Sequence, residues 1–459
     1  MKFIRAISTC LFRKQLLMPL IHVTALRKRV LNSGSWTLAG YGLSQFLRFA
    51  GNLILTRLLF PEAFGLMAIY QAIYYGVHML TDVGIGPSIV QHKHGNEPAF
   101  LNTAWTVQVV RGFLAWIGFC LLALPMATIY REPSLVTILP VVGLTAFIAG
   151  FSSSKLHTAQ RNLDAVRVTQ IEIGASAIGL LCTILLAWYL KSVWALVWGN
   201  LITSTIQMTA SHVALKGISN KFAWDNESLK HMRGFGRWIL FNSALTFLSV
   251  EGARLLMGAI LDMRQLALYS LASTMSLILW QAMQQLAGRV LFPAYSEVHR
   301  ANPENFMNVL FKARMIIILP CWGLAVFFIL FGVPLMDTLY DARYHGSGDM
   351  LQILAAGTLV SFVWGSYSGV LMAKGKVAAM TVLTAIQIAI QISALFIGYH
   401  YIGALGIVMG IAAANWILYP PSAYIMHRFG VWQPKLDIAI IAASVLVIIA
   451  AWSRIPQVV

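Results

Sequence analysis

Long apolar runs alternate with short polar loops along almost the whole chain. A transmembrane helix needs about 20 predominantly apolar residues to cross a hydrocarbon core about 30 Å thick. The pattern therefore predicts a series of membrane-spanning α-helices. The last apolar run is short, so the sequence leaves open whether there are 12, 13 or 14 of them. The expected spans lie near residues 36–59, 64–90, 104–129, 135–155, 168–190, 193–214, 238–261, 266–292, 308–332, 350–373, 377–399, 403–426 and 437–452.

The composition agrees with this pattern and excludes a set of soluble domains. Hydrophobic residues make up 58% of the 459 residues and charged residues 11%, whereas soluble proteins carry about 25% charged residues. The loops are short, so there is no room for the large external loop that a membrane-bound glycosyltransferase or polymerase would need for catalysis. We predict an all-α polytopic membrane protein that is not an enzyme.

The charge distribution indicates how the chain is oriented. The net charge is +17, with 33 Lys and Arg against 16 Asp and Glu. Assigning alternate loops to the two sides places 23 basic residues, Arg314 among them, on the side of the N-terminus. The positive-inside rule then puts the N-terminus in the cytoplasm, and nucleic-acid binding is not expected. Six basic residues lie on the other side (Arg57, Arg131, Lys191, Arg264, Arg343 and Arg454), and four within spans (Arg48, Arg111, Arg254 and Arg289).

The two halves of the chain resemble each other at a shift of 202 residues. Trp36 aligns with Trp238, and residues 64–68 align with 266–270. Six spans separate the copies, so both halves enter the membrane in the same direction, as in transporters that bind substrate between parallel repeats. The expected organisation is a basic cytoplasmic tail (1–35), an N-terminal six-helix bundle (36–215), a cytoplasmic linker (216–237), a C-terminal six-helix bundle (238–428) and an additional transmembrane helix (429–459).

Polar residues gather on one face of several predicted spans. Their spacing of three or four residues keeps them on the same side of a helix. Four such faces around an axis would line a water-filled cleft. The polar faces consist of Tyr41, Gln45, Arg48, Asn52 and Thr56 in the first span, Gln71, Tyr75, His78 and Asp82 in the second, Ser243 and Arg254 in the seventh, and Ser273, Trp280 and Gln284 in the eighth.

Arg48 and Arg254 are the main candidates for substrate binding. An arginine at the centre of a span costs about 2.5–3.5 kcal/mol, so a protein-lined aqueous cavity is the expected environment. A guanidinium matches phosphate oxygens bidentately, and a polyprenyl diphosphate-linked sugar would bring such oxygens into the membrane. Packing against neighbouring carbonyls or carboxylates is the other interpretation of both arginines. The further substrate-binding candidates are Tyr41, Gln45, Asn52, Tyr75 and Trp280, for sugars, and Arg289, for first attraction or as a positive-inside anchor.

Two acidic residues are candidates for ion coupling. Glu251 lies three residues before Arg254, so an ion pair within the helix is expected. Protonation of Glu251, or cation binding to it, would change the availability of that arginine. Asp82 is the second candidate, and capping or hinging the end of the second span is its other interpretation. No phosphate-binding loop, nucleophile or metal-ligand motif is present, so no metal and no cofactor are expected.

Several motifs resemble the Wzx-type polysaccharide flippases of the MOP exporter superfamily. They are Thr56–Leu66 (TRLLFPEAFGL) with Asp82–Gly86 (DVGIG), and Ala267–Ser270 (ALYS) with Arg289–Pro293 (RVLFP) in the second half. The resemblance covers about residues 33–430. It implies two six-helix bundles in a V, with helices one, two, seven and eight lining a cationic central cavity and Arg48 as a cavity arginine. The long basic tail and the single thirteenth span depart from that pattern.

The resemblance also implies an activity and a location. The activity is the flipping of undecaprenyl diphosphate-linked oligosaccharides across the bacterial inner membrane, by alternating access driven by protons or sodium, for export of O-antigen, capsule or exopolysaccharide. A polysaccharide polymerase and a chain-length regulator are the expected protein partners. The main alternative is a MATE-like cation-coupled antiporter of small molecules. A cationic substrate would favour acids in the cleft, whereas Arg48 and Arg254 lie there.

Overall fold

The computed structural model describes residues 40–451, and within that range all regular structure is helical, which confirms an all-α protein. Six of the described helices are long and apolar enough to cross a membrane, in agreement with a polytopic membrane protein; they are Pro98–Ile129, Val166–Leu190, Phe306–Leu339, Ser347–Gly365, Ala379–Ile402 and Ala404–Arg428. The positions inside 40–451 that lie outside the description are 41, 82–83, 92–94, 162–164, 231–242, 245–246, 248–250, 253, 287–303, 305, 368–369 and 372–376.

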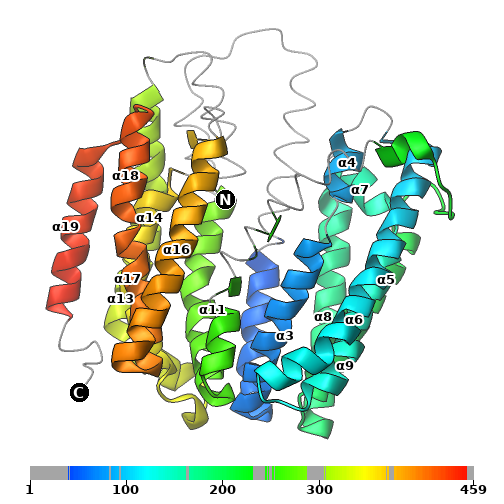
Figure 1. Ribbon diagram of the computed structural model, residues 1–459, viewed down its shortest axis with the longest axis horizontal. Coiled ribbons are helices and arrows are strands. Elements are labelled where there is room, and N and C mark those ends of the chain that lie inside the picture. The colour runs from blue at the N-terminus through cyan, green and yellow to red at the C-terminus, as the bar shows by residue number, and fades with distance from the viewer. Residues whose placement is uncertain are drawn as a thin grey trace.

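The helices form two groups (Figure 1). The first group consists of a helical segment at 42–58, α3 (Pro61–Leu80), α4 (Ile85–Gln91), α5 (Pro98–Ile129), α6 (Leu135–Gly150), α7 (Lys155–Arg161), α8 (Ala165–Leu190) and α9 (Trp194–Val213). The second group consists of a helical segment at 254–260, α11 (Met263–Leu286), α13 (Phe306–Leu339), η3 (Ala342–Tyr344), α14 (Ser347–Gly365), α16 (Val377–Ile402), α17 (Ala404–Ile417), α18 (Tyr419–Arg428) and α19 (Pro434–Ala450).

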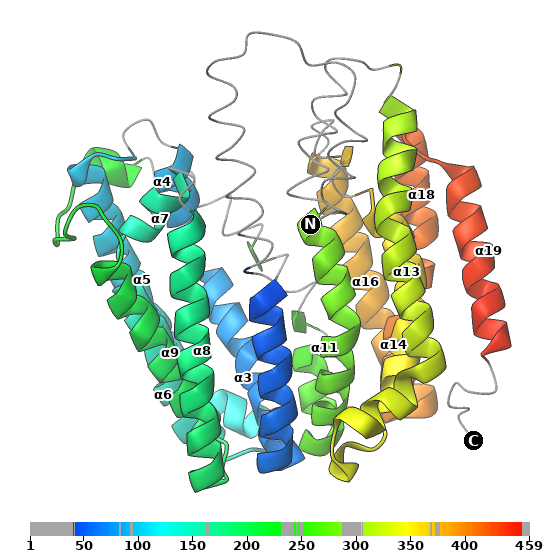
Figure 2. The same cartoon turned by 180° about the vertical axis from the view of Figure 1, so that it is seen from behind.

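The two groups meet at one end and diverge toward the other, as Figures 1 and 2 both show. We call the end where they meet the closed end; it consists of residues 56–65, 257–268 and 340–346. We call the opposite end, which carries α4, α7 and the chain after α9, the splayed end. The α3 and α11 helices both begin at the closed end and pack against each other there.

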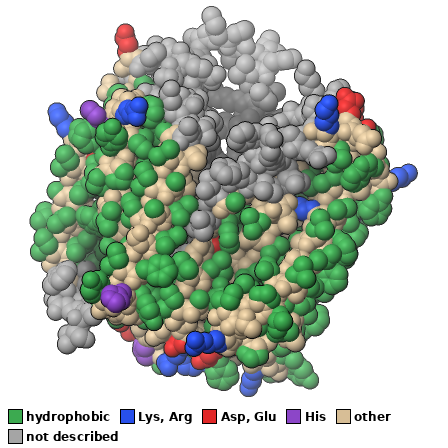
Figure 3. Space-filling model, in the orientation of Figure 1, with side chains coloured by type: hydrophobic (Ala, Val, Ile, Leu, Met, Phe, Trp, Pro, Cys, Tyr) green, Lys and Arg blue, Asp and Glu red, His purple; other side chains and the backbone are tan. Residues whose placement is uncertain are grey.

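The outer surface of the molecule is suited to a bilayer. Figure 3 shows hydrophobic side chains over its middle, with Lys, Arg, Asp and Glu mainly toward the two ends. Large apolar side chains on the outer helices are exposed, such as Leu121 on α5 and Leu181 on α8. Because lipid is as apolar as these side chains, their exposure carries little cost in a membrane.

The predicted span 64–90 is not one continuous helix. The α3 helix ends at Leu80, and α4 begins at Ile85 after Gly84, whose φ of +68° is a left-handed conformation. Glycine adopts this conformation without the steric penalty of a Cβ atom. The hydroxyl of Thr81 donates to the Val77 carbonyl and satisfies a backbone group at the end of α3. The apolar run 64–90 was therefore predicted as one span, but the backbone conformation at Gly84 divides it into α3 and α4.

The chain that follows α9 is fixed to the first group at the splayed end. The backbone amides of Lys221, Ala223 and Asp225 donate to the side chains of Asn102, Thr106 and Thr103 on α5, each across 3.1 Å. These residues belong to the predicted linker 216–237, of which the structure describes 216–230. The first part of the connection between the two groups is thus held against the first group rather than suspended between the two.

Candidate functional site

Arg48 lies on the helical segment 42–58, and its side chain is exposed. It makes no hydrogen bond or ion pair to any residue that the structure describes. With a rise of 1.5 Å per residue, it lies about 15 Å from the last residue of this segment at the closed end. A fixed positive charge therefore stands near the middle of this helical segment without a protein partner among the described residues.

Gln45, one turn before Arg48, connects the two groups of helices. Its Nε2 atom donates to Oε1 of Gln281 on α11 across 3.1 Å. Asn52, the next predicted site residue on this face, is half-buried. At the position of Gln45, the polar face predicted for the first span therefore contacts α11 of the second group.

Arg254 and Glu251 form the ion pair that their spacing predicts. The distance between Arg254 Nη1 and Glu251 Oε2 is 2.9 Å. The glutamate side chain is 6% exposed and the arginine side chain 18% exposed. Arg254 lies about 10 Å from Leu261 at the closed end, a depth similar to that of Arg48. The two arginines therefore differ in state, because Arg254 is already neutralised by a carboxylate and Arg48 is not.

Two of the predicted sugar-contacting aromatic residues differ in their surroundings. Tyr75 on α3 is 51% exposed, and its assignment as a sugar contact remains a prediction. Trp280 on α11 instead packs within the second group, where its ring lies 5.1 Å from that of Trp364 and against Gly365 on α14. Trp280 thus helps to hold α11 against α14, and its assignment as a sugar contact remains a prediction. The sequence pattern does not distinguish a tryptophan that faces a cleft from one that packs against a neighbouring helix.

Three predicted site residues, Tyr41, Asp82 and Arg289, lie outside the described residues. Their assignments as a sugar contact, an ion-coupling acid and a substrate-attracting cation remain predictions. No group of three or more His, Cys, Asp or Glu residues is arranged to hold a metal ion in the part of the chain that the structure describes.

The closed end is a packed junction between the groups. A continuous hydrophobic cluster there includes Ile69 of α3, Met257 and Leu266. Gly65 approaches so closely that a β-carbon in its place would collide with the Met263 carbonyl. The Tyr130 hydroxyl donates to the Leu255 carbonyl across 3.3 Å. At this end the two groups share one core.

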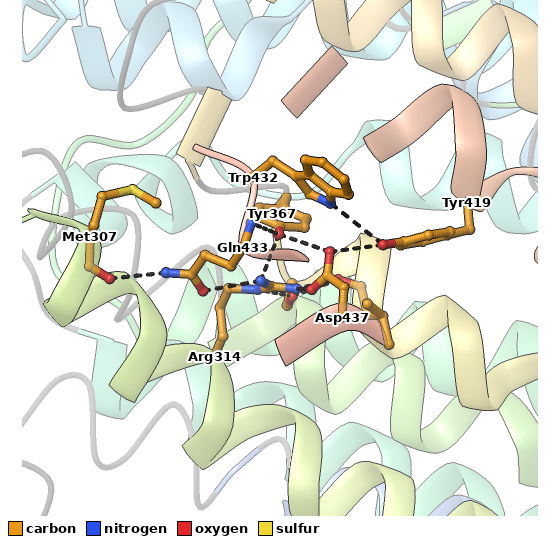
Figure 4. A network of polar contacts seen from close by, with 9 residues as sticks. Met307, Arg314, Tyr367, Tyr419, Trp432, Gln433 and Asp437 are labelled. Carbon is orange, nitrogen blue, oxygen red and sulfur yellow. Dashed lines mark hydrogen bonds and ion pairs between the residues drawn. The ribbon is translucent and has the colours of Figure 1, made fainter. Parts of the chain in front are cut away.

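A buried polar network in the second group was not predicted as such (Figure 4). Arg314 on α13 donates through Nη2 to Oδ1 of Asp437 on α19 across 2.6 Å, and neither side chain is exposed. Arg314 also donates hydrogen bonds to Val363, Ser366, Tyr367 and Gln433. Asp437 also accepts hydrogen bonds from the hydroxyls of Tyr367 and Tyr419. Arg314 was counted with the basic residues on the side of the N-terminus and falls inside the predicted span 308–332. In the structure it lies within α13, and its partner, Asp437, was not predicted.

The network has one signal in the sequence. Asp437 is an acid at the start of a strongly apolar run. Charged residues inside transmembrane segments generally face a partner within the protein. Which partner it meets depends on tertiary packing, because Arg314 lies 123 residues earlier in the chain.

The fold, with polar and charged side chains inside apolar helices, defines an all-α polytopic transmembrane protein. A family profile described as "Polysaccharide biosynthesis protein" matches residues 54–348. The chain belongs to this family, the Wzx-type polysaccharide flippases of the MOP superfamily.

Individual relatives and structures agree with this assignment. The chain is 23% identical over 396 residues to the lipopolysaccharide biosynthesis protein WzxC of Escherichia coli K12, covering 84% of this chain and 78% of WzxC. A structure of the lipid II flippase MurJ in an inward closed conformation matches 90% of this chain and 93% of its own, with a TM-score of 0.67 and 12% identity. An inward-facing multidrug resistance MATE family transporter of the MOP superfamily matches 84% of this chain and 94% of its own, with a TM-score of 0.65 and 14% identity. Since a flippase and a drug transporter both share the fold, the fold alone does not define the substrate.

Proposed function

We propose that this protein flips a polyprenyl diphosphate-linked oligosaccharide, with undecaprenyl as the carrier, from the cytoplasmic to the periplasmic leaflet of a bacterial inner membrane. Its family, and a relative named for lipopolysaccharide biosynthesis, support a polysaccharide precursor as the substrate. The flipped product would be passed to a polysaccharide polymerase and a chain-length regulator.

The observation that carries the proposal is the state of Arg48. Its guanidinium is exposed and has no partner among the described residues. Holding a charge at the centre of a span costs about 2.5–3.5 kcal/mol. A diphosphate offsets that cost, because its oxygens accept charge-assisted hydrogen bonds from the planar guanidinium. Gln45, Asn52 and Tyr75 offer polar groups to the attached sugars.

The distribution of charge supports an orientation for this conformation. The splayed end carries more basic residues than the closed end. They are Lys155, Arg161, Lys216, Lys221 and Lys230 at the splayed end, against Arg57, Arg264 and Arg343 at the closed end. The positive-inside rule then places the splayed end in the cytoplasm. In this orientation the conformation is the one that receives substrate from the cytoplasmic leaflet, and the junction at the closed end must open for release.

The ion pair between Glu251 and Arg254 is the proposed point of ion coupling. While Glu251 is ionised, Arg254 is neutralised across 2.9 Å. A proton on Glu251, or a sodium ion beside it, would free the guanidinium of Arg254. That guanidinium could then bind oxygens of the diphosphate in addition to those bound by Arg48. Substrate binding and ion binding would then be linked through a single carboxylate.

Flipping in vesicles tests the proposal. The purified protein is reconstituted with a fluorescent diphosphate-linked oligosaccharide lipid, and the fraction accessible to a membrane-impermeant quencher is followed over time. A neutral glycolipid without phosphate and a fluorescent organic cation are the comparison substrates. We expect protein-dependent flipping of the diphosphate lipid alone. Transport of the organic cation without flipping of the diphosphate lipid would instead support a MATE-like antiporter and overturn the proposal.

A further inference from the structure

Arg343 of the second group holds the end of the first helix of the first group. It lies in η3, the short turn between α13 and α14. Its Nη2 atom donates to the carbonyl oxygens of Thr56, across 3.2 Å, and of Arg57, across 3.1 Å. Carbonyls in the last turn of a helix lack partners within the helix and carry a partial negative charge. A guanidinium is therefore a well-matched partner for them.

Asp341 orients this arginine. One of its carboxylate oxygens accepts hydrogen bonds from the Arg343 backbone amide, across 3.0 Å, and from its Nε atom, across 3.1 Å. The guanidinium also lies 5.7 Å from the ring of Phe60, which follows the first helix. Both contacts fix the side chain in the direction of the first group. Asp341 of the second group and Phe60 of the first group thus both hold Arg343 in position for its contact with the first helix.

Tyr344, the next residue, has a different effect at the same junction. Its side chain is 2% exposed, and its ring lies edge-on to Phe64 of α3 with 6.1 Å between the ring centres. Its hydroxyl has no hydrogen-bond partner among the described residues, and the same is true of Tyr340 beside it. A buried hydroxyl without a partner disfavours the state that buries it. Opening the junction would give the Tyr344 hydroxyl access to water.

On the basis of the proposed function, in which this end opens to release substrate, we infer that Arg343 and Tyr344 are its gating residues with opposite effects. Arg343 is the latch that stabilises the closed junction. The hydroxyl of Tyr344 limits that stability, so that the junction can open at a useful rate. The gate is therefore balanced by the satisfied charge of Arg343 against the unsatisfied hydroxyl of Tyr344, beside that of Tyr340, rather than held by packing alone.

A distance measurement at the closed end tests this inference without any substrate. Spin labels on cysteines at Lys191, between α8 and α9, and at Tyr401, at the end of α16, report the separation of the two groups in a chain without its native cysteines. Arg343→Ala should raise the population with the longer distance about tenfold, since hydrogen bonds from a charged donor are lost. Arg343→Lys should give an intermediate value, because a point charge contacts the carbonyls less well.

Tyr344→Phe should act in the opposite direction and lower the population with the longer distance about fivefold or more. The matched controls are Arg264→Ala, an exposed arginine at the same end that bonds no described residue, and Tyr424→Phe, an exposed tyrosine on α18. Both should leave the distances unchanged. Unchanged distances with Arg343→Ala, or a longer distance with Tyr344→Phe, would overturn the gate. Since no substrate is present, a failure of diphosphate-lipid flipping would count against the proposed function and not against the gate.

Discussion

Arg314 and Asp437 form an ion pair across 2.6 Å between α13 and α19, and neither side chain is exposed. Trp322 on α13 and Ser444 on α19 form a second polar contact between the same helices, across 2.7 Å. The helix beyond the two sets of six predicted spans is therefore not a loose appendage. It is held to the second group by buried polar bonds that a lipid environment cannot replace.

Asp437→Ala should strongly destabilise the protein. Removing one member of a buried ion pair leaves an uncompensated charge and costs about 3–5 kcal/mol. The melting temperature of the purified protein in detergent measures this loss. A double change of Arg314→Met and Asp437→Leu should recover much of the stability, because neither charge is then left alone. A single variant as stable as the parent would contradict the role of this pair.

Gly65→Val should prevent the closed end from forming. Any side chain at this position meets the backbone of Met263, which cannot move as a side chain can. We expect an inserted protein with the two groups held apart at this end and with flipping abolished, measured by the spin-label distance and by the vesicle assay. Gly174→Ala is the matched control, since nothing lies within 4 Å of a β-carbon at that position on α8. Normal flipping by the Gly65 variant would show that the junction does not need to close.

Glu251→Gln should uncouple flipping from the ion gradient. The amide cannot take up a proton as the carboxylate does, so Arg254 would stay available at every pH. Flipping by vesicles with and without a proton or sodium gradient measures the coupling, and the variant should be indifferent to both gradients. Glu227→Gln, on the exposed chain after α9, is the control and should retain the gradient response. A gradient response that survives Glu251→Gln would assign coupling to another residue.

The latch should be insensitive to pH across the physiological range. The backbone amide of Arg343 and its guanidinium hold the pKa of Asp341 below its ordinary value of 3.8, and Arg57 of the first group adds to the effect. With a lowered pKa, the carboxylate stays ionised above pH 3.8 and orients Arg343 toward the first group there, and it loses this effect as the pH falls through the lowered value. The spin-label distance should therefore stay constant from about pH 8 to pH 5 and lengthen only below about pH 4. With Asp341→Asn, that acid-dependent change should disappear.

The sequence predicted those features that depend on neighbouring residues. The Glu251–Arg254 pair follows from a spacing of three on one helix, and the all-α fold follows from the length of the apolar runs. The break between Leu80 and Ile85 was missed because hydropathy does not report a left-handed glycine. The surroundings of Trp280 and the partner of Arg314 could not be predicted, because each depends on helices distant in sequence. A polar residue in a span reveals that a partner is needed, and packing decides which partner it is.

In the proposed function, Arg48 binds the diphosphate of a lipid-linked oligosaccharide. The most direct test of this binding is the flipping rate of that lipid in vesicles containing Arg48→Ala, compared with Arg48→Lys and with Arg264→Ala as a control cation. We predict that Arg48→Ala inserts and folds normally but flips about 10- to 100-fold more slowly, as expected for lost hydrogen bonds to a charged group. Arg48→Lys should retain part of the rate, and Arg264→Ala all of it. A folded Arg48→Ala protein that flips the diphosphate lipid at the parental rate would contradict diphosphate binding by Arg48.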